Sequence, residues 1–402
     1  MPDPAAGGRR ALAFIFLTVF LDLLGVGILV PVLPYIVREF RSDALTVGLL
    51  SLTFAAAQFI ASPVLGALAD RHGRRPVLLL SVLGTGVGYF LFGAGKALWL
   101  LYLARLLDGF TGGNVSTAQA YIADVSPVED RAKNFGLIGA AFGLGFVLGP
   151  AIGGLLSQWS LRAPAFAAGG LSLVTVTLGY LALPESLPPE RRARTPLRLT
   201  DLDPLGHLGA ALRRPGLGRL FLAFFAMSLA MAGLQSNFAV YTHARFGLGP
   251  QGNAVLFTVV GTVSIVVQGG LLRRISTAGH EGRIAVGGLA CMAAGFAATA
   301  FAPGLGWLYP AIVVLAFGSA AAGPMLTGEV SHSVGPTEQG WVLGSMQSVA
   351  SLARIVGPAW AGLAFDHVGP RAPYWSGALW VLAGLVAAGV SFRPADRPSL
   401  AA

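Results

Sequence analysis

Ionisable residues inside long apolar stretches are the first candidates for chemistry in this sequence. Asp22 lies in the middle of the first stretch. Arg105 and Asp108 lie three residues apart in the fourth, and Arg354 lies in the eleventh. Charges at such depth are costly, so they usually mark function. A carboxylate in a low dielectric takes up a proton more readily than in water, which is what proton coupling requires. Asp22 is therefore a candidate proton site, although a packed residue held by an arginine or a backbone donor would show the same pattern.

Arg105 and Asp108 share one side of their stretch with small and polar residues. On a continuous helix, Gly112, Ser116 and Gln119 fall within the same arc of about 80°. Such a stripe is expected to face a cavity rather than lipid. Asp108 can equally be a structural neutraliser of Arg105 at this spacing, and both interpretations stay open. The candidate cavity residues are Asp22, Ser116, Gln119, Gln235, Asn237, Gln347 and Arg354.

Several kinds of chemistry find no support in the motifs. No phosphate-binding pattern of the form G-x-x-x-x-G-K-[ST] is present, which argues against an ATP-driven pump. The six histidines and single cysteine lack metal-ligand spacing, and no credible nucleophile and base occur together. We therefore expect neither an enzyme, nor a cofactor, nor a metal site.

The elements that hold these residues are membrane-spanning helices. The 402 residues are 54% hydrophobic and only 11% charged, with a mean hydropathy of +0.70, whereas soluble domains average about 25% charged residues. A spanning helix needs about 20 apolar residues. Twelve stretches are of that order: 11–37, 44–69, 76–96, 98–122, 134–158, 162–184, 217–243, 251–272, 283–302, 306–327, 341–366 and 371–392. The hydrophilic segment 185–216 divides them into halves at 1–184 and 217–402.

Positive charge predicts the orientation in the membrane. With both termini in the cytoplasm, 19 Lys and Arg residues fall on the cytoplasmic side and 6 on the other. The net charge of +9 therefore reports topology and not a nucleic-acid partner. The first apolar stretch is too long for a signal-peptide core, so we interpret it as a retained helix.

The two halves carry similar sequences at similar depths. Gly149-Pro150 in the fifth stretch matches Gly357-Pro358 in the eleventh, and Asp124-Val125-Ser126 matches Glu329-Val330-Ser331. This order indicates a duplicated six-helix unit, as in transporters built from parallel repeats.

Two glycine-containing segments also stand out. The loop from Gly66 to Pro76 is rich in positive charge, but its Asp70 needs another explanation. Asp70 could dock on the positive end of a neighbouring helix or on Arg131. In the fifth stretch, glycines recur at intervals of four around Pro150, which favours close helix packing and permits a bend.

Several of these segments resemble a known family. The loop at 66–75 resembles the signature loop of the major facilitator superfamily, and Arg105 matches that family's intramembrane arginine. The run from Gly143 to Gly154 resembles the motif of its proton-coupled antiporters. Three segments are similar to those of tetracycline-efflux and related multidrug antiporters: Leu21–Ile28, Pro31–Pro34 and Leu183–Ser186.

The resemblance implies an all-α membrane protein with 12 transmembrane helices in two pseudo-symmetric six-helix bundles, a central cavity and alternating access. It implies a proton or substrate role for Asp22 and a proton-relay role for Arg105, to which we add Asp108. It also implies a cytoplasmic gate around Asp70 and an antiport hinge at Gly149 and Pro150. The expected gate comprises Gly66, Asp70, Arg71, Gly73, Arg74, Asp124 and Arg131. The expected antiporter motif comprises Gly145, Gly149, Pro150, Gly153 and Gly154.

The chain also departs from that family. Tetracycline exporters carry an acid in the third span, where this chain has Gly88, and another in the ninth, where it has none between Arg283 and Pro303. Tetracycline itself and the number of coupled protons stay open.

We expect a monomeric, multi-pass protein of the cell membrane that exchanges protons for amphipathic, drug-like compounds. The alternative is a carrier of a sugar, metabolite or lipid-like molecule. A third possibility is a receptor or scaffold that does not transport, but no appended soluble domain in the sequence supports it.

Overall fold

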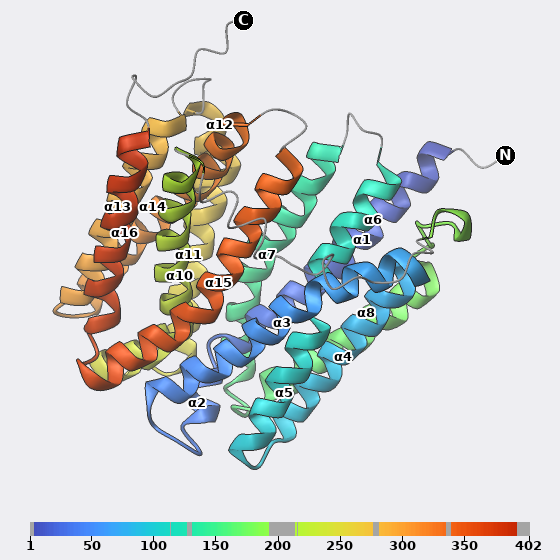
Figure 1. Cartoon of the computed structure of the whole chain (residues 1–402). Coiled ribbons are helices and arrows are strands. Elements are labelled where there is room, and N and C mark those ends of the chain that lie inside the picture. Colours follow the sequence, from blue (N-terminus) through green and yellow to red (C-terminus); the bar gives the residue numbers. More distant parts are fainter. Residues whose placement is uncertain are drawn as a thin grey trace, which may run out of the picture. The chain divides into compact units, whose positions relative to one another are not determined.

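The computed structural model describes residues 4–112, 114–126, 131–192, 214, 216–275, 281–334 and 339–391. Within these ranges it is helical and contains no strand (Figure 1). The first part of the chain forms α1 (Pro4–Leu29), α2 (Leu33–Val37), α3 (Ala44–His72), α4 (Arg74–Ala94), α5 (Leu98–Thr111), α6 (Asn114–Val125), α7 (Arg131–Leu156) and α8 (Ala163–Ala182). The second part forms α10 (Leu217–Phe246), α11 (Pro250–Val266), α12 (Leu272–Ile275), α13 (Glu281–Phe301), α14 (Leu305–His332), α15 (Gln339–His367) and α16 (Ala372–Ser391). A single turn of 3-10 helix (Pro189–Arg191) follows α8, and a π-helical turn (Val267–Leu271) joins α11 to α12.

Ten of the described helices are long and apolar enough to cross a membrane, and a shorter apolar helix covers Gly143–Leu156. The predicted all-helical membrane fold is confirmed, while the count of twelve continuous spans is not reached in the described residues. The fourth apolar stretch accounts for one difference, because it forms two helices, α5 and α6, that are each too short to qualify.

The break between α5 and α6 falls at a pair of glycines. Gly112 ends α5, and its carbonyl accepts a hydrogen bond of 2.7 Å from the side-chain amide of Gln58 on α3. A carbonyl released from a helix needs such a partner inside a membrane. The predicted polar stripe from Arg105 to Gln119 assumed one continuous helix. Because the helix is broken at Gly112, these residues do not form a single helical face.

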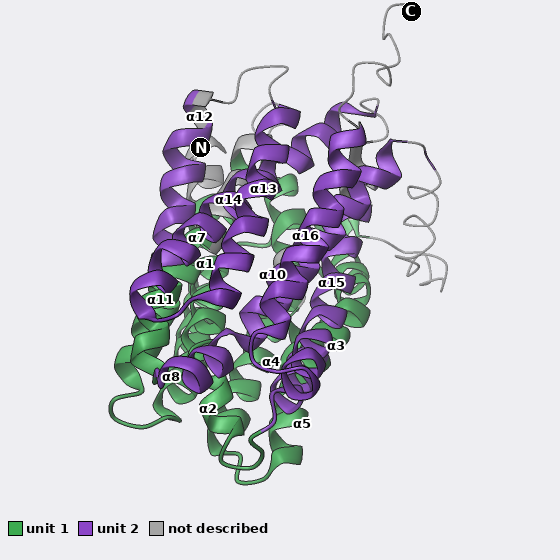
Figure 2. Ribbon diagram, turned by 90° about the vertical axis from the view of Figure 1, so that its left-hand side faces the viewer, with its two compact units in different colours: residues 1–42, 53–202, 249–258 green, residues 43–52, 203–248, 259–402 purple. Residues whose placement is uncertain are grey.

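The chain forms two compact units (Figure 2). The first contains residues 1–42, 53–202 and 249–258, and the second contains 43–52, 203–248 and 259–402. Each unit thus takes one short segment from the other half of the sequence.

Close packing and polar contacts attach each of these short segments. In the second unit, the Asp366 carboxylate at the end of α15 accepts the backbone N–H groups of Ala44 and Leu45, at 3.0 and 2.7 Å. These donors are unsatisfied at a helix start, so the carboxylate caps α3. In the first unit, the Asn253 amide of α11 donates to the Tyr35 hydroxyl at 2.8 Å.

A line of glycines lets α1 and α7 approach until their backbones touch. A Cβ added at Gly149 would lie 2.6 Å from the Gly27 Cα, and one at Gly27 would lie 2.6 Å from the Gly145 carbonyl oxygen. A Cβ at Gly153 would collide with the Ile28 carbonyl. Gly145, Gly149 and Gly153 of the expected antiporter motif therefore pack α7 against the helix that carries Asp22, whereas a Cβ at Gly154 would meet Ala254 of α11.

The α1–α7 contact yields a stability prediction. Gly149→Ala should lower the free energy of unfolding by about 1–3 kcal/mol, because its methyl group meets backbone that cannot rotate away. Gly170→Ala on α8 is the matched control, since nothing lies within 4 Å of its added Cβ. There the loss of chain entropy in the unfolded state should leave stability equal or higher, by up to about 1 kcal/mol. Thermal unfolding of the purified proteins followed by size-exclusion chromatography measures both, and an unaffected Gly149→Ala protein would contradict the close contact.

Candidate functional site

The buried charges of the first unit form an ion pair on α5. Arg105 and Asp108 lie one turn apart, and the Arg105 Nη1 is 3.0 Å from the Asp108 Oδ2. Their exposed fractions are 8% and 2%. The spacing permitted this structural pairing, and the pair is formed. The contact does not exclude a further role, because the carboxylate also carries the interactions described next.

Aromatic and hydroxyl groups complete the surroundings of the pair. The Arg105 guanidinium lies over the ring of Phe92, 4.8 Å from its centroid, and 5.8 Å from that of Phe54. Both are within cation–π range. The hydroxyl of Thr85 hydrogen-bonds the Asp108 carboxylate. The charged groups are thus held in a defined arrangement on α5 by side chains from α3 and α4.

Asp22 belongs to the same cluster. It interacts electrostatically with Asp108, and both carboxylates and Arg105 interact with the buried side chain of Tyr89. Tyr89 lies beside α1, because a Cβ added at Gly25 would be 3.3 Å from its ring and 3.7 Å from its hydroxyl. Asp22 itself is half-buried. The structure therefore brings together the three predicted residues, and we name Asp22, Tyr89, Arg105 and Asp108 the charged cluster.

Tyr89 was missed by the sequence analysis. It is 1% exposed, and among the described residues its hydroxyl has no hydrogen-bond partner. A tyrosine in an apolar stretch carries no signal of its own. The only indication in the sequence that this position matters came from the neighbouring residue, Gly88, which stands where the resembling exporters carry an acid.

Gly88 contacts the charged cluster directly. A Cβ added there would lie 3.1 Å from the Asp108 Cβ and 3.2 Å from the Ala104 carbonyl oxygen. A side chain at this position on α4 would therefore enter the space that Asp108 fills from α5. The two helices can approach this closely because Gly88 has no side chain.

A second set of charges lies where α3 meets α4. The Arg74 Nη1 is 2.6 Å from the Asp70 Oδ1, and its Nε is 3.1 Å from the Asp124 Oδ2. The Asp124 oxygen also accepts the Ser186 hydroxyl at 3.1 Å. Glu185 accepts the Arg74 backbone N–H at 2.8 Å. We name Asp70, Arg74, Asp124, Glu185 and Ser186 the loop cluster.

Gly73 is required at the centre of the loop cluster. Its φ of +104° lies in a region that other residues rarely adopt, and an added Cβ would collide with the Glu185 carboxylate. Asp70 pairs with Arg74. The side chain of Arg131, the other partner expected for Asp70, lies outside the described residues. Arg71 is half-buried, and a Cβ at Gly66 would meet nothing within 4 Å. Glu185 and Ser186, known from the sequence only through the resemblance, are the additional members.

The remaining predicted cavity residues are distributed over both units. Gln119 in the first unit is exposed, and the side chain of Ser116 lies outside the described residues. In the second unit Gln235 and Gln347 are exposed, while Asn237 is 2% exposed. Within the described part of the chain neither amide atom of Asn237 has a hydrogen-bond partner.

Arg354 is a charged residue of the second unit that lies inside a helix apolar enough to span a membrane. It lies within the candidate span Ser345–His367, where its Nη2 donates to the Ser351 hydroxyl at 3.0 Å. No carboxylate pairs with it in the ranges that the structure describes.

Comparison with known proteins agrees with this architecture. The class C tetracycline resistance protein of Escherichia coli is 35% identical over 378 residues, which cover 93% of each chain. The crystal structure described as the human organic anion transporter MFSD10 (TETRAN) is similar with a TM-score of 0.73 and 27% identity, covering 95% of this chain and 99% of that one. A nucleoside transporter, NupG, shares the fold with a TM-score of 0.76 at 15% identity, covering 95% of this chain and all of the other. The profile of the Major Facilitator Superfamily matches residues 15–358, and the chain belongs to this superfamily of transporters.

Proposed function

We propose that this transporter exports amphipathic, drug-like compounds in exchange for protons by alternating access. The observation that carries the proposal is the charged cluster, which places two carboxylates and one guanidinium among apolar helices. The relatives named as tetracycline resistance proteins support the substrate class. We further propose that the chain works as a monomer in the cell membrane with both termini in the cytoplasm.

The charge balance of the cluster suits proton coupling. Asp22 and Asp108 place two carboxylates near one guanidinium, so a proton bound at either acid raises the net charge of the cluster by one. Charges interact strongly where little water is present, so this change is large enough to bias a conformational equilibrium. Asp22 is less buried than Asp108, which is 2% exposed. We therefore assign the proton to Asp22 and the neutralisation of Arg105 to Asp108.

Asp108 also offers a physical explanation for the absence of an acid at position 88. The resembling exporters carry a carboxylate there on the third span, and here Asp108 fills the adjoining space from the next helix. The acid is thus replaced in space rather than lost, which supports a coupling site similar to that of the exporters. No such replacement is evident for the missing acid of the ninth span.

The loop cluster suits a gate. Arg74 holds two carboxylates from different helices, and Glu185 binds its backbone. Breaking these contacts would release α3 and α4 from the segment after α8. We propose that the transporter makes and breaks them as it changes conformation.

A second candidate function is the transport of organic anions. Arg354 lies in a candidate span without a carboxylate partner among the described residues, and Gln347 is exposed two turns earlier on the same helix. A guanidinium in that setting fits a carboxylate or sulfonate on the substrate. The likeness to a protein described as an organic anion transporter supports this alternative.

The first prediction tests proton coupling. Asp22→Asn should fold normally but lose accumulation driven by a pH gradient in proteoliposomes, because an amide cannot take up the coupling proton. Exchange of labelled for unlabelled substrate should persist, since it needs no net proton movement. Glu190→Gln, an exposed acid in another segment, is the control and should retain both activities. Gradient-driven accumulation at the wild-type level in Asp22→Asn would rule out this assignment.

The second prediction tests the replacement of the acid. Asp108→Gly should lose coupled transport and destabilise the protein by about 3–5 kcal/mol, because it leaves Arg105 buried without its partner. Adding Gly88→Asp to that variant should restore transport and part of the thermal stability, since the carboxylate returns to the same space from α4 while its Cβ lies only 3.2 Å from the Ala104 carbonyl oxygen. Gly88→Asn with Asp108→Gly matches it in size without the charge and should stay inactive. Equal recovery in the two double variants would mean that volume, and not charge, matters.

The third prediction separates the two substrate classes. If the substrate is an anion that Arg354 binds, Arg354→Gln should reduce its transport by about ten- to hundredfold, the effect of one lost charged hydrogen bond. Arg354→Lys should retain part of the activity. Uptake of a panel of cationic dyes, anionic conjugates and sugars provides the measurement. Unchanged anion transport in Arg354→Gln would exclude the second candidate, and cation transport that needs Arg354 would contradict both assignments.

A further inference from the structure

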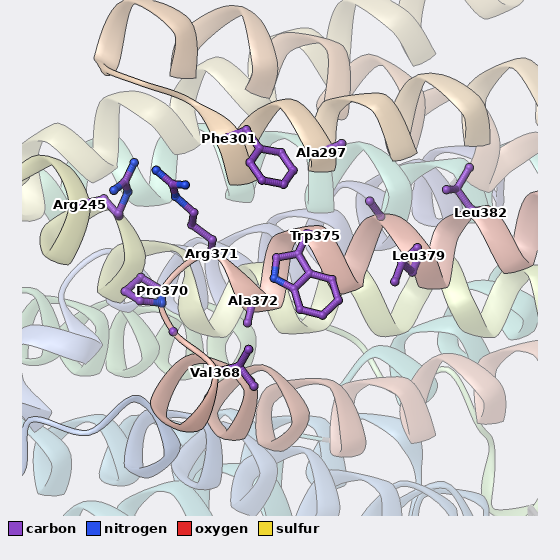
Figure 3. Close-up of a pocket in the computed structure, with 12 residues that line it drawn as sticks. Arg245, Ala297, Phe301, Val368, Pro370, Arg371, Ala372, Trp375, Leu379 and Leu382 are labelled. Atoms are coloured by element: carbon purple, nitrogen blue, oxygen red, sulfur yellow. The ribbon is translucent and has the colours of Figure 1, made fainter.

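A groove on the second unit lies away from the residues used so far. It occupies about 740 Å³ where α10 and α13 end and α16 begins. Its lining includes Arg245, Phe301, Arg371, Trp375, Leu379 and Leu382. Figure 3 shows the two arginines at one end of the groove and Leu382 toward the other.

The arginine end is rich in unsatisfied positive charge. Arg371 is exposed at the start of α16. Arg245 donates to the Ala302 carbonyl at 3.3 Å and to the Tyr241 hydroxyl, while its buried Nε has no partner among the described residues. Within those same residues neither guanidinium forms an ion pair.

The neighbouring acid is already engaged. Asp366 is five residues before Arg371, but both of its oxygens accept backbone N–H groups at the start of α3. It is therefore held on α3 and is not paired with either arginine. The end of the groove keeps a net positive charge that a ligand can neutralise.

The rest of the groove is apolar and follows the direction of α16. Trp375, Leu379 and Leu382 are spaced by four and three residues, so they lie along one face of that helix. Phe301 on α13 faces them across the groove and is 62% exposed. The distance along the helix from Arg371 to Leu382 is about 16 Å. That length accommodates much of an acyl chain, whereas a small inorganic anion would leave it empty.

We propose that this groove binds an anionic phospholipid. The phosphate contacts Arg245 and Arg371, because guanidinium groups bind phosphate oxygens in a planar, two-pronged geometry. One acyl chain lies against Trp375, Leu379 and Leu382. Net negative charge on the headgroup favours the site over a zwitterionic lipid, whose own cation opposes the arginines. The site lies wholly in the second unit and does not involve the charged cluster, so it goes beyond the proposed transport function.

Competition between two lipids tests the proposal. The purified full-length protein is incubated with equal amounts of phosphatidylglycerol and phosphatidylcholine of identical acyl chains, and bound lipids are counted by native mass spectrometry. The wild-type protein should retain phosphatidylglycerol preferentially. Arg371→Gln should lower the ratio of the two lipids about fivefold, equivalent to ~1 kcal/mol for one basic residue. The double variant Arg371→Gln with Arg245→Gln should lose the preference for phosphatidylglycerol. Replacing Arg371 by Lys instead of Gln, with Arg245 unchanged, should keep most of the preference.

Three controls make the outcome decisive. Arg41→Gln removes an exposed arginine of the first unit and should leave the lipid ratio unchanged. Ala297→Phe fills the apolar part of the groove while keeping both arginines, and it should reduce retention of the long-chain lipid. Inorganic phosphate should protect the protein from thermal unfolding far less than phosphatidylglycerol does.

Four results would overturn the lipid site. Three of them are equal retention of both lipids by the wild-type protein, an equal loss in Arg41→Gln, and protection by inorganic phosphate as strong as that by the lipid. The last would indicate a small-anion site. Displacement of bound phosphatidylglycerol by an anionic drug at equal concentration would reassign the groove to substrate binding.

Discussion

The guanidinium of Arg105 cannot be buried without compensation, and the interior of the first unit is arranged around that constraint. Removing a charge from water costs several kcal/mol even after the protein relaxes. Asp108 neutralises it, Phe92 offers the face of its ring, and Thr85 hydrogen-bonds the carboxylate. Each partner comes from α4 or α5, so the charge specifies how these two helices pack. Asp22 adds a second carboxylate that interacts with Asp108, so the unit holds two acids beside one guanidinium.

The position of Asp22 depends on a different kind of contact. Carboxylates on a helix can reach a buried partner only if the helix is close, and α1 is held by backbone contact with α7. In lipid there is little hydrophobic drive to associate helices, so packing of small residues provides much of the attraction. Gly27 and Gly149 are therefore as necessary to the charged cluster as the charged residues, although neither touches it. The same principle operates at Gly73, where the absence of a side chain admits the Glu185 carboxylate.

The fold and most of the site were predictable from the sequence for identifiable reasons. Apolar stretches of spanning length report membrane helices because the bilayer leaves the backbone few alternatives. Asp22, Arg105 and Asp108 stood out because charges are rare in such stretches. Tyr89 did not, since an aromatic residue is ordinary there and its importance comes from what faces it. The pairing of Arg74 with Asp124 joins residues 50 positions apart, a distance over which spacing says nothing. The helix break at Gly112 was not predicted, because a pair of glycines does not by itself end a membrane helix. The Gln58 amide that binds the Gly112 carbonyl lies on a different helix, α3.

The contact between Gly88 and Asp108 restricts how such a site can change over evolutionary time. An acid on α4 and an acid on α5 are two solutions to neutralising one arginine. A lineage that passes between them by single substitutions must go through a form with both acids or a form with neither. The form with neither strands the arginine, which is severely destabilising. The form with both places a second side chain in the space that Asp108 fills, so α4 and α5 must move apart, and it brings two carboxylates together, which favours a proton on one of them. Each single step therefore carries a cost, and an alignment that compares residues only column by column would record the two steps as an unrelated loss and gain.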